Sequence, residues 1–433
     1  MYKTLIKSAL SSLIVSFLLV QAEGQSDFVL QDSYKSEIKS LADHEAVKRA
    51  FNHIMTLEAE TRADHIKLTE IPAPPFKEEK RAEAFKVMLK SAGVDSIWID
   101  EVGNVLALKR GKIGARTVCL DAHLDTVFPE ETDVTVKESN DTLFAPGIGD
   151  DTRGLALLLA IVKTMDQQKI EMNDDVLYIA SVGEEGLGDL RGVKHIFRED
   201  GPKIDSWISI DGGDVGRVNN MGLGSYRYRV IYKGPGGHSW GAFGLVNPHH
   251  ALGDAIARFV ERADDFVSTG PRTSYNVGVI SGGTSVNSIP FESIMEIDMR
   301  SVEPSQLDSM ETLLEISVKE ALDNQNAKRK LGAELSVEII KIGDRPSGEL
   351  SSDLPLIQRA LCATAQIGRR PSLTRGSTNS NIPISLNIPA VTIGRGGVGA
   401  NAHALDEWWL NKEGHKSIQM ALLLLVAEAG LAE

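Results

Sequence analysis

The chain alternates between short apolar runs and longer stretches with helical periodicity. Four apolar runs predict buried strands, at residues 117–120, 176–181, 206–210 and 390–393. The run at 155–162 predicts a buried helix, and residues 43–70 and 77–92 have the spacing of amphipathic helices. Buried strands interleaved with helices are typical of parallel sheets that are covered on both faces. The chain is therefore predicted to be an α/β protein with a mostly parallel sheet flanked by helices.

The pattern changes near residue 225. Alternating apolar and polar residues predict half-buried strands at 226–232, 274–280, 293–299 and 334–341. Two helices are predicted among them, one beginning at Asn247-Pro248 and the other at Pro304. The resulting order β-α-β-β-α-β is that of a ferredoxin-like domain. We expect this second domain to be inserted into the first.

The first residues carry the pattern of a secretory signal peptide. Lys3 and Lys7 form a positive start, residues 9–20 form an apolar run, and Val20-Gln-Ala22 offers a small-residue cleavage site. An uncleaved membrane anchor is the alternative, although the run is shorter than the roughly 20 apolar residues that a span needs. We expect cleavage and a secreted or periplasmic protein. The expected divisions are a signal peptide at 1–22, the first domain in two parts at 23–224 and 344–433, and the inserted domain at 225–343.

Charge narrows the range of partners. The 433 residues carry a formal net charge of −14, and no basic stripe interrupts the acidic balance. A nucleic-acid partner is therefore not expected, because such partners are recognised through clustered Lys and Arg. After cleavage of the signal peptide, no membrane association is expected either.

Acids, histidines or glycines closely follow each of the four predicted strands of the first domain. Taken singly, each group is also compatible with ordinary loop chemistry, for example an acidic pair that caps a helix. The groups are His123 with Asp125, the pair Asp150-Asp151, the pair Glu184-Glu185, Asp211 in Asp-Gly-Gly, and His403. Because strand ends of a parallel sheet share one edge, these side chains are expected to converge. Imidazole and carboxylate ligands suit zinc, with manganese or cobalt as substitutes.

These motifs, in this order, resemble the dinuclear zinc peptidases that include glutamate carboxypeptidase, peptidase T, carnosinase, aminoacylase and succinyl-diaminopimelate desuccinylase. The resemblance covers essentially the whole mature chain. It implies two metal sites that share a bridging Asp150, with His123 and Asp211 completing one site and Glu185 and His403 the other. In this family the peptide bond between the paired acids is often cis.

The resemblance also implies roles for residues around the metals. Asp125 would orient the metal-binding histidine, and Glu184 would be the general base. The inserted domain matches the family's lid and dimerisation domain, in which His238 would reach the active site of a partner subunit and stabilise an oxyanion. Asn287 and Arg300 match segments that bind substrate, although a structural salt bridge is the alternative for Arg300.

One position departs from the family pattern. The segment 376–381 is often written with aspartate at its fourth place, and here that residue is Asn379. The aspartate is not a metal ligand in the family. The departure therefore bears on substrate contacts rather than on catalysis.

The implied function is metal-dependent hydrolysis of peptide bonds in short peptides by a homodimer, through a water activated by two metal ions. Aspartate at the fourth ligand, Asp211, favours the peptidase T-like aminopeptidases and dipeptidases. An N-acyl-amino-acid deacylase or a carboxypeptidase on the same scaffold is the alternative. A binding protein that has lost turnover is the alternative of another class, and the complete ligand set with Glu184 argues against it.

Overall fold

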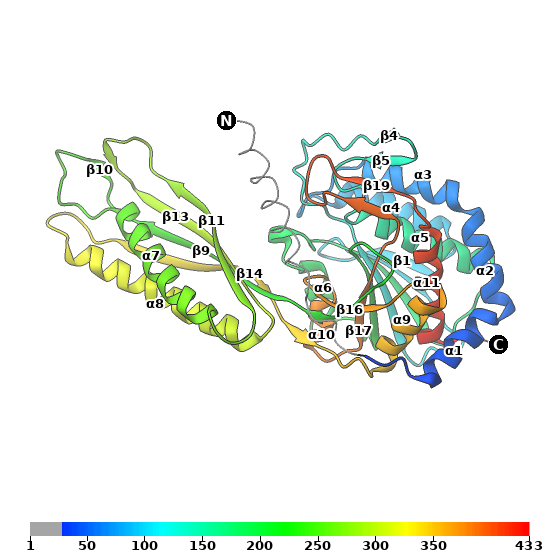
Figure 1. The fold of residues 1–433 in the computed structure, drawn as a ribbon. Coiled ribbons are helices and arrows are strands. Elements are labelled where there is room, and N and C mark those ends of the chain that lie inside the picture. Colours follow the sequence, from blue (N-terminus) through cyan, green and yellow to red (C-terminus); the bar gives the residue numbers. More distant parts are fainter. Residues whose placement is uncertain (1–27, 433) are drawn as a thin grey trace, which may run out of the picture.

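The computed structural model describes residues 28–432, so the predicted signal peptide lies outside the described residues. Two lobes are visible in Figure 1. Following the expectations from the sequence, we name the larger one the catalytic domain and the smaller one the lid domain. The chain passes from the first into the second along β9 (Gly224–Lys233) and returns along β14 (Ser336–Arg345). The lid domain is therefore an insertion. None of the described helices is long and apolar enough to cross a membrane.

The catalytic domain is organised around a nine-stranded sheet. At its centre β6 (Asp175–Ser181), β3 (Thr117–His123), β7 (Ser206–Ile210) and β17 (Ala390–Ile393) run parallel to one another. These are the four strands predicted from apolar runs. Five further strands flank them: β1 (Ser96–Ile99), β2 (Val105–Lys109), β8 (Arg217–Gly222), β15 (Gly348–Glu349) and β16 (Ser372–Gly376). Antiparallel pairings of β2 with β6 and of β8 with β17 make the sheet mixed at its margins.

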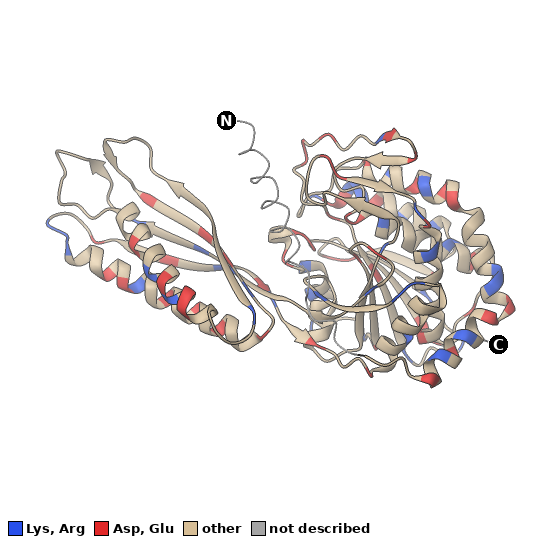
Figure 2. Cartoon of the chain, in the orientation of Figure 1, with Lys and Arg blue, Asp and Glu red and all other residues tan. Residues whose placement is uncertain are grey.

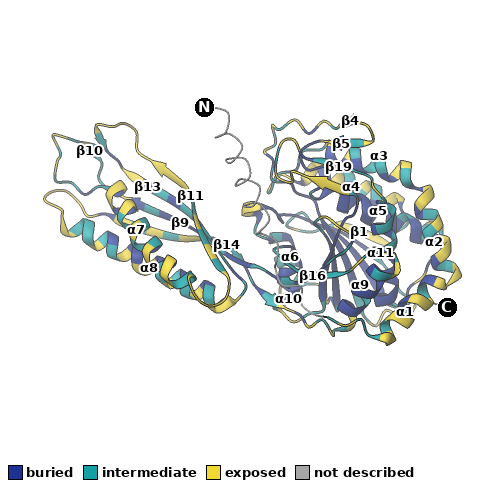
Figure 3. Ribbon diagram, viewed as in Figure 1, coloured by how far each residue is buried: buried dark blue, intermediate teal, exposed yellow. Residues whose placement is uncertain are grey.

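Both faces of this sheet are covered by helices. Because side chains of a strand alternate between faces, Leu120 of β3 joins one core and its neighbour Cys119 joins the other. The larger core is closed by α1 (Asp32–Asp43), α2 (Glu45–Thr56), α4 (Glu79–Ser91), α5 (Thr152–Gln167), α9 (Pro355–Gln366) and α11 (His415–Ala429). The smaller core is closed by α6 (Arg191–Ile196) and α10 (Asn381–Ser385). Figure 3 shows the strands between these layers as buried.

The stretch predicted as helical at 43–70 forms α2 and α3 (Glu58–Thr69), which are separated at Leu57. α3 packs on α5 and leads toward a small antiparallel sheet above the strand ends. This sheet consists of β4 (Lys137–Ser139), β5 (Thr142–Phe144), β19 (Trp408–Leu410) and β18 (Val398–Ala400). Pairing of β5 with β19 brings the segment before Asp150 next to the segment after His403.

The lid domain has the predicted β-α-β-β-α-β order and its own core. Its sheet has the order β11-β13-β9-β14, with β11 (Thr273–Gly282) at one edge and β13 (Glu292–Ser301) next to it. Helices α7 (Pro248–Val267) and α8 (Pro304–Ala327) cover one face. They turn apolar residues such as Phe259 and Leu314 to the sheet and carry charged residues elsewhere on their surface (Figure 2). Two short strands, β10 (Gly237–His238) and β12 (Ser288–Ile289), lie near the end of the lid farthest from the catalytic domain.

Candidate metal centre

Side chains with metal-binding atoms follow the central parallel strands at one edge of the sheet. β3 ends at His123, β6 is followed by Glu184 and Glu185, and β7 is followed by Asp211. Asp150 comes from the loop before α5. Because the carboxyl ends of parallel strands lie at the same edge, the fold brings these five residues together.

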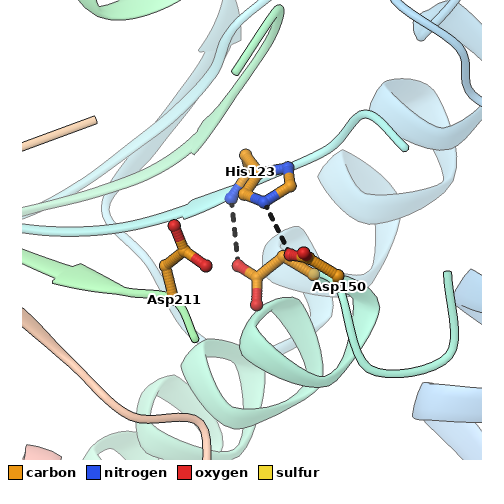
Figure 4. A group of neighbouring side chains, drawn as sticks. His123, Asp150 and Asp211 are labelled. Atoms are coloured by element: carbon orange, nitrogen blue, oxygen red, sulfur yellow. Dashed lines mark hydrogen bonds and ion pairs between the residues drawn. The ribbon is translucent and has the colours of Figure 1, made fainter. Parts of the chain in front are cut away.

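His123, Asp150 and Asp211 form the first cluster, shown in Figure 4. Nε2 of His123 lies 3.3 Å from Oδ1 of Asp150. Asp151 joins this cluster, and one ligating atom from each of the four residues lies within 4.8 Å of the others. The peptide bond between Asp150 and Asp151 is cis, as the resemblance implied.

A second cluster shares Asp150 with the first. Nε2 of His403 lies 2.9 Å from Oε1 of Glu185 and 3.3 Å from Oδ2 of Asp150. The two oxygens of Asp150 therefore face different histidines. A carboxylate with its oxygens divided in this way has the geometry needed to bridge two cations.

The donor set and its burial fit divalent metal ions. Imidazole nitrogens and carboxylate oxygens are the ligands found at catalytic zinc sites. Oδ1 of Asp151 is buried without a hydrogen-bond partner, and burial raises the pKa of this carboxyl well above its ordinary value. Hydrogen bonds with Asp150 and Glu185 raise the pKa of His403 to about 10. A bound cation would compensate the negative charges of Asp150 and Glu185, which otherwise favour the protonated form of His403.

Asp125 connects the first histidine to the paired glutamates. Its carboxylate accepts the main-chain N–H of Glu184 over 2.9 Å and that of Glu185 over 2.7 Å. Nδ1 of His123 lies 3.0 Å from the main-chain oxygen of Asp125 and 3.6 Å from its carboxylate. This arrangement places the ring proton on Nδ1 and leaves Nε2 as the metal-binding atom.

Glu184 is buried and close to the clusters. It forms a further group with His123 and Glu185 whose ligating atoms lie within 4.8 Å of one another. Burial raises the pKa of Glu184 well above its ordinary value, and the charge of Arg345 opposes that rise. A buried carboxyl whose pKa is raised in this way can both accept and release a proton.

Two residues of the site received no role from the sequence. Nη1 of Arg395, in the loop after β17, lies 3.2 Å from Oδ1 of Asp150 and 3.8 Å from Oδ1 of Asp211. The carboxylate of Glu407 accepts the main-chain N–H groups of Gly147, Gly149 and Asp150 over 2.7 to 3.0 Å. Only their positions in the sequence could have indicated a role: Arg395 closely follows a predicted strand, and Glu407 lies shortly after His403.

Asn379 occupies a buried polar network below the metal centre. Its Nδ2 donates to Oδ2 of Asp121 and to Oγ of Ser181, both over 2.8 Å. Ser209 donates to the same carboxylate oxygen over 2.7 Å. Only 2% of the Asn379 surface is exposed, so its amide group serves this network. The position of the Asn379 side chain therefore gives no support to the expectation that this residue affects substrate contacts.

The three lid residues lie apart from this cluster. The exposed His238 is the last residue of β10 and the exposed Asn287 precedes β12, near the end of the lid farthest from the catalytic domain (Figure 1). Arg300 forms an ion pair with Asp298 over 2.7 Å and lines a cavity of about 590 Å³ between the lid and β16. Within the described chain, the structure therefore brings together the five predicted metal ligands, Asp125 and Glu184, but not His238 or Asn287.

Comparison with known proteins identifies the family. The model of peptidase family M20/M25/M40 matches residues 119–427. The protein belongs to this family. Its members are hydrolytic metallopeptidases that bind a dinuclear metal centre, which agrees with the clusters around Asp150.

Individual relatives of this M20 protein are distant. A putative LysW-lysine/LysW-ornithine hydrolase from Pyrobaculum aerophilum is 25% identical over 72% of this chain and 82% of its own length. The aminopeptidase PepT from Bacillus cereus superimposes with a TM-score of 0.65 and 18% identity, covering 85% of this chain and 97% of that one. The Bacillus subtilis YxeP protein, described as a dinuclear metal-binding peptidase, gives 0.60 and 16%, covering 87% and 99%. At these identities the structural likenesses establish the fold.

Proposed function

We propose that this protein is an aminopeptidase or dipeptidase that hydrolyses short peptides with two divalent metal ions, of which zinc is the first to test. The observation that carries the proposal is the position of Asp150, whose two oxygens face His123 and His403 beside a buried Glu184. This geometry supports the binding of two metal ions beside a carboxyl group, as hydrolysis through an activated water requires.

Each protein side chain has a defined task in this reaction. When bound, the two ions would polarise the scissile carbonyl and lower the pKa of the attacking water. Glu184 takes the proton from that water and delivers it to the leaving amine. Asp125 keeps His123 in the metal-binding tautomer and fixes the backbone of the glutamate pair.

A homodimer would supply the missing oxyanion donor. His238 is exposed at the end of the lid, where it has no access to the metal centre of its own chain. The lid also carries exposed apolar side chains: Trp240, Phe243, Val279, Ile280, Val286 and Phe291. β11, which carries two of them, is an edge strand with one unpaired side. These features support pairing of two lids, with His238 acting in the partner's site.

The substrate class is the finer part of the proposal. Aspartate at the fourth ligand, Asp211, and the fold shared with PepT favour cleavage after a free amino-terminal residue. The Pyrobaculum relative, by its name, acts on a lysine or ornithine linkage, which keeps the deacylase and carboxypeptidase reactions as the alternatives. The signal-like start favours action outside the cytoplasm on peptides that reach the periplasm or medium.

A substrate panel tests the proposal. Purified mature protein, loaded with zinc, manganese or cobalt, is given dipeptides and tripeptides with free or blocked amino termini, and N-acetyl amino acids. We expect chelator-sensitive release of the first residue from free amino termini only. Cleavage of blocked peptides or N-acetyl amino acids would contradict the aminopeptidase assignment.

The variant Glu184→Gln tests whether Glu184 is the general base. Glu184→Gln keeps the side-chain shape and should lower turnover by about a hundredfold to ten-thousandfold while two metal ions per chain remain bound. Turnover close to that of the wild type would mean that another group takes the proton.

A further inference from the structure

The side chain of Arg345 contacts Glu184 at two points. Arg345 is the last residue of β14, the lid strand on which the chain returns to the catalytic domain. Its Nη1 donates to Oε1 of Glu184 over 3.2 Å, and its Nη2 donates to the main-chain oxygen of the same residue. One planar guanidinium therefore fixes both the carboxylate and the backbone of Glu184.

This contact is removed from solvent. Arg345 and Glu184 expose only 4% and 5% of their surfaces. Nη1 also donates to Oγ of Ser377 over 3.1 Å, whereas Nε is buried without a partner. Charge-assisted hydrogen bonds of this kind are strong and directional, and removal of one member of a buried pair leaves the other charge uncompensated. The orientation of the guanidinium is thus set by Glu184 and Ser377.

The loop that carries Glu184 is held from two domains. From the catalytic domain, Asp125 accepts two of its main-chain N–H groups. From the lid, Arg227 of β9 donates to the main-chain oxygen of Gly186, and the main-chain N–H of Asp344 donates to the carboxylate of Asp189 over 2.9 Å. Arg345 is the lid residue in this group that reaches the carboxylate itself.

We propose that Arg345 is a positioning residue for Glu184, which holds the general base in its working orientation and links it to the base of the lid. This inference rests on the proposed function. The contact occupies Oε1 of Glu184, so we assign the proton transfer to Oε2. A base that must reach first the water and then the leaving amine gains rate from a fixed side-chain geometry, because small misplacements are costly. Neither the metal ions nor the substrate need contact Arg345 for this effect.

Two substitutions test the proposal in the metal-loaded enzyme. Arg345→Met removes both contacts and should lower kcat about 10-fold to 100-fold, as loss of a supporting hydrogen bond does at other sites. KM and the metal-to-chain ratio should stay at wild-type values, because the ligands and the substrate pocket are untouched. Arg345→Lys retains one ammonium that reaches one of the two oxygens, so it should recover part of the lost kcat.

The control is Arg229→Met. Arg229 lies on lid strand β9 and pairs with Glu296 over 2.6 Å inside the lid, so its loss should leave kcat unchanged. A kcat of Arg345→Met within twofold of the wild type, or a loss of kcat that accompanies loss of metal, would overturn the proposal. If Arg345→Met does not fold, Arg345→Lys decides, because a wild-type kcat in that variant would also overturn the proposal. Failure of the proposed function is seen separately in the substrate panel, as cleavage of blocked peptides or N-acetyl amino acids by the wild-type enzyme.

Discussion

The metal centre and the far end of the lid differ in how complete they are within one chain. At the metal centre, carboxylates, two histidines and Arg395 meet at the edge of a sheet and are joined by ion pairs within one chain. At the end of the lid, His238 and Asn287 are exposed among apolar side chains such as Trp240 and Val286. The first region is assembled by the fold of one chain, whereas we propose that the second is completed by a partner subunit.

Substitution of Asp150, which the two proposed metal sites share, should reduce metal binding and turnover the most. Asp150→Asn replaces one bridging oxygen with an amide nitrogen that cannot bind a cation. We expect the bound metal to fall from two ions per chain to one or fewer, and turnover to fall roughly a thousandfold or more. Metal analysis by mass spectrometry and peptide turnover measure both quantities. Two ions retained at full affinity would show that the clusters do not share a bridge.

The next effect tests whether the lid end acts in another subunit. His238→Ala should lower turnover roughly 100-fold without loss of metal, because it removes an oxyanion donor. A mixture of His238→Ala and Glu184→Gln subunits should recover about a quarter of wild-type activity, since half of the dimers are hybrids and each hybrid contains one complete site. Assays of the mixture after subunit exchange provide the measurement. No recovery, with hybrids present, would place His238 outside the partner's site.

A smaller effect is expected at Glu407, which holds the loop of Asp150 by three main-chain N–H groups. Glu407→Gln turns one acceptor oxygen into a donor that faces those N–H groups. Metal affinity should weaken about 10-fold to 100-fold, as measured by competition with a chelator. Glu349→Gln, at an exposed ion pair with Arg375, is the matched control and should leave the metal affinity unchanged.

A weaker effect, on the free energy of unfolding, is expected for His65, which contacts the loop that carries Asp150. Burial lowers the pKa of His65 from 6.5 to about 3, and its Nε2 lies 2.5 Å from the main-chain oxygen of Ile148. Below pH 6.5, His65 is protonated in the unfolded chain but stays neutral in the folded chain. The free energy of unfolding therefore falls by about 1.4 kcal/mol for each pH unit toward pH 3. His65→Gln should reduce this slope by that amount in thermal unfolding of the metal-free protein. An unchanged slope would mean that His65 is charged in the folded state.

The central strands were predictable because their signals are local, whereas the expected metal ligands rested on the order of the motifs along the chain. An apolar run followed by His123 or Glu184 identifies both a strand and the residue at its end. The flanking strands were not predicted. β1 has four residues and β15 two, and β8 contains Asn219 and Asn220, so none shows a clear period.

The supporting residues could not be predicted for a different reason. Arg345, Arg395 and Glu407 act across sequence separations of more than 150 residues, on Glu184 and on the loop of Asp150. Their partners are set by tertiary packing, which leaves no periodic or spacing signal. For Asn379, the sequence did give a signal, because the family often has aspartate at that position. The signal did not indicate that the amide of Asn379 donates a hydrogen bond to Asp121.

The proposed mechanism requires one chain to hold two divalent ions through a shared Asp150. Metal-free wild-type protein can be titrated with zinc while bound ions and peptide turnover are followed together. We expect saturation at two ions per chain, with full turnover reached only when the second ion is bound. Full turnover with a single bound ion per chain would contradict it.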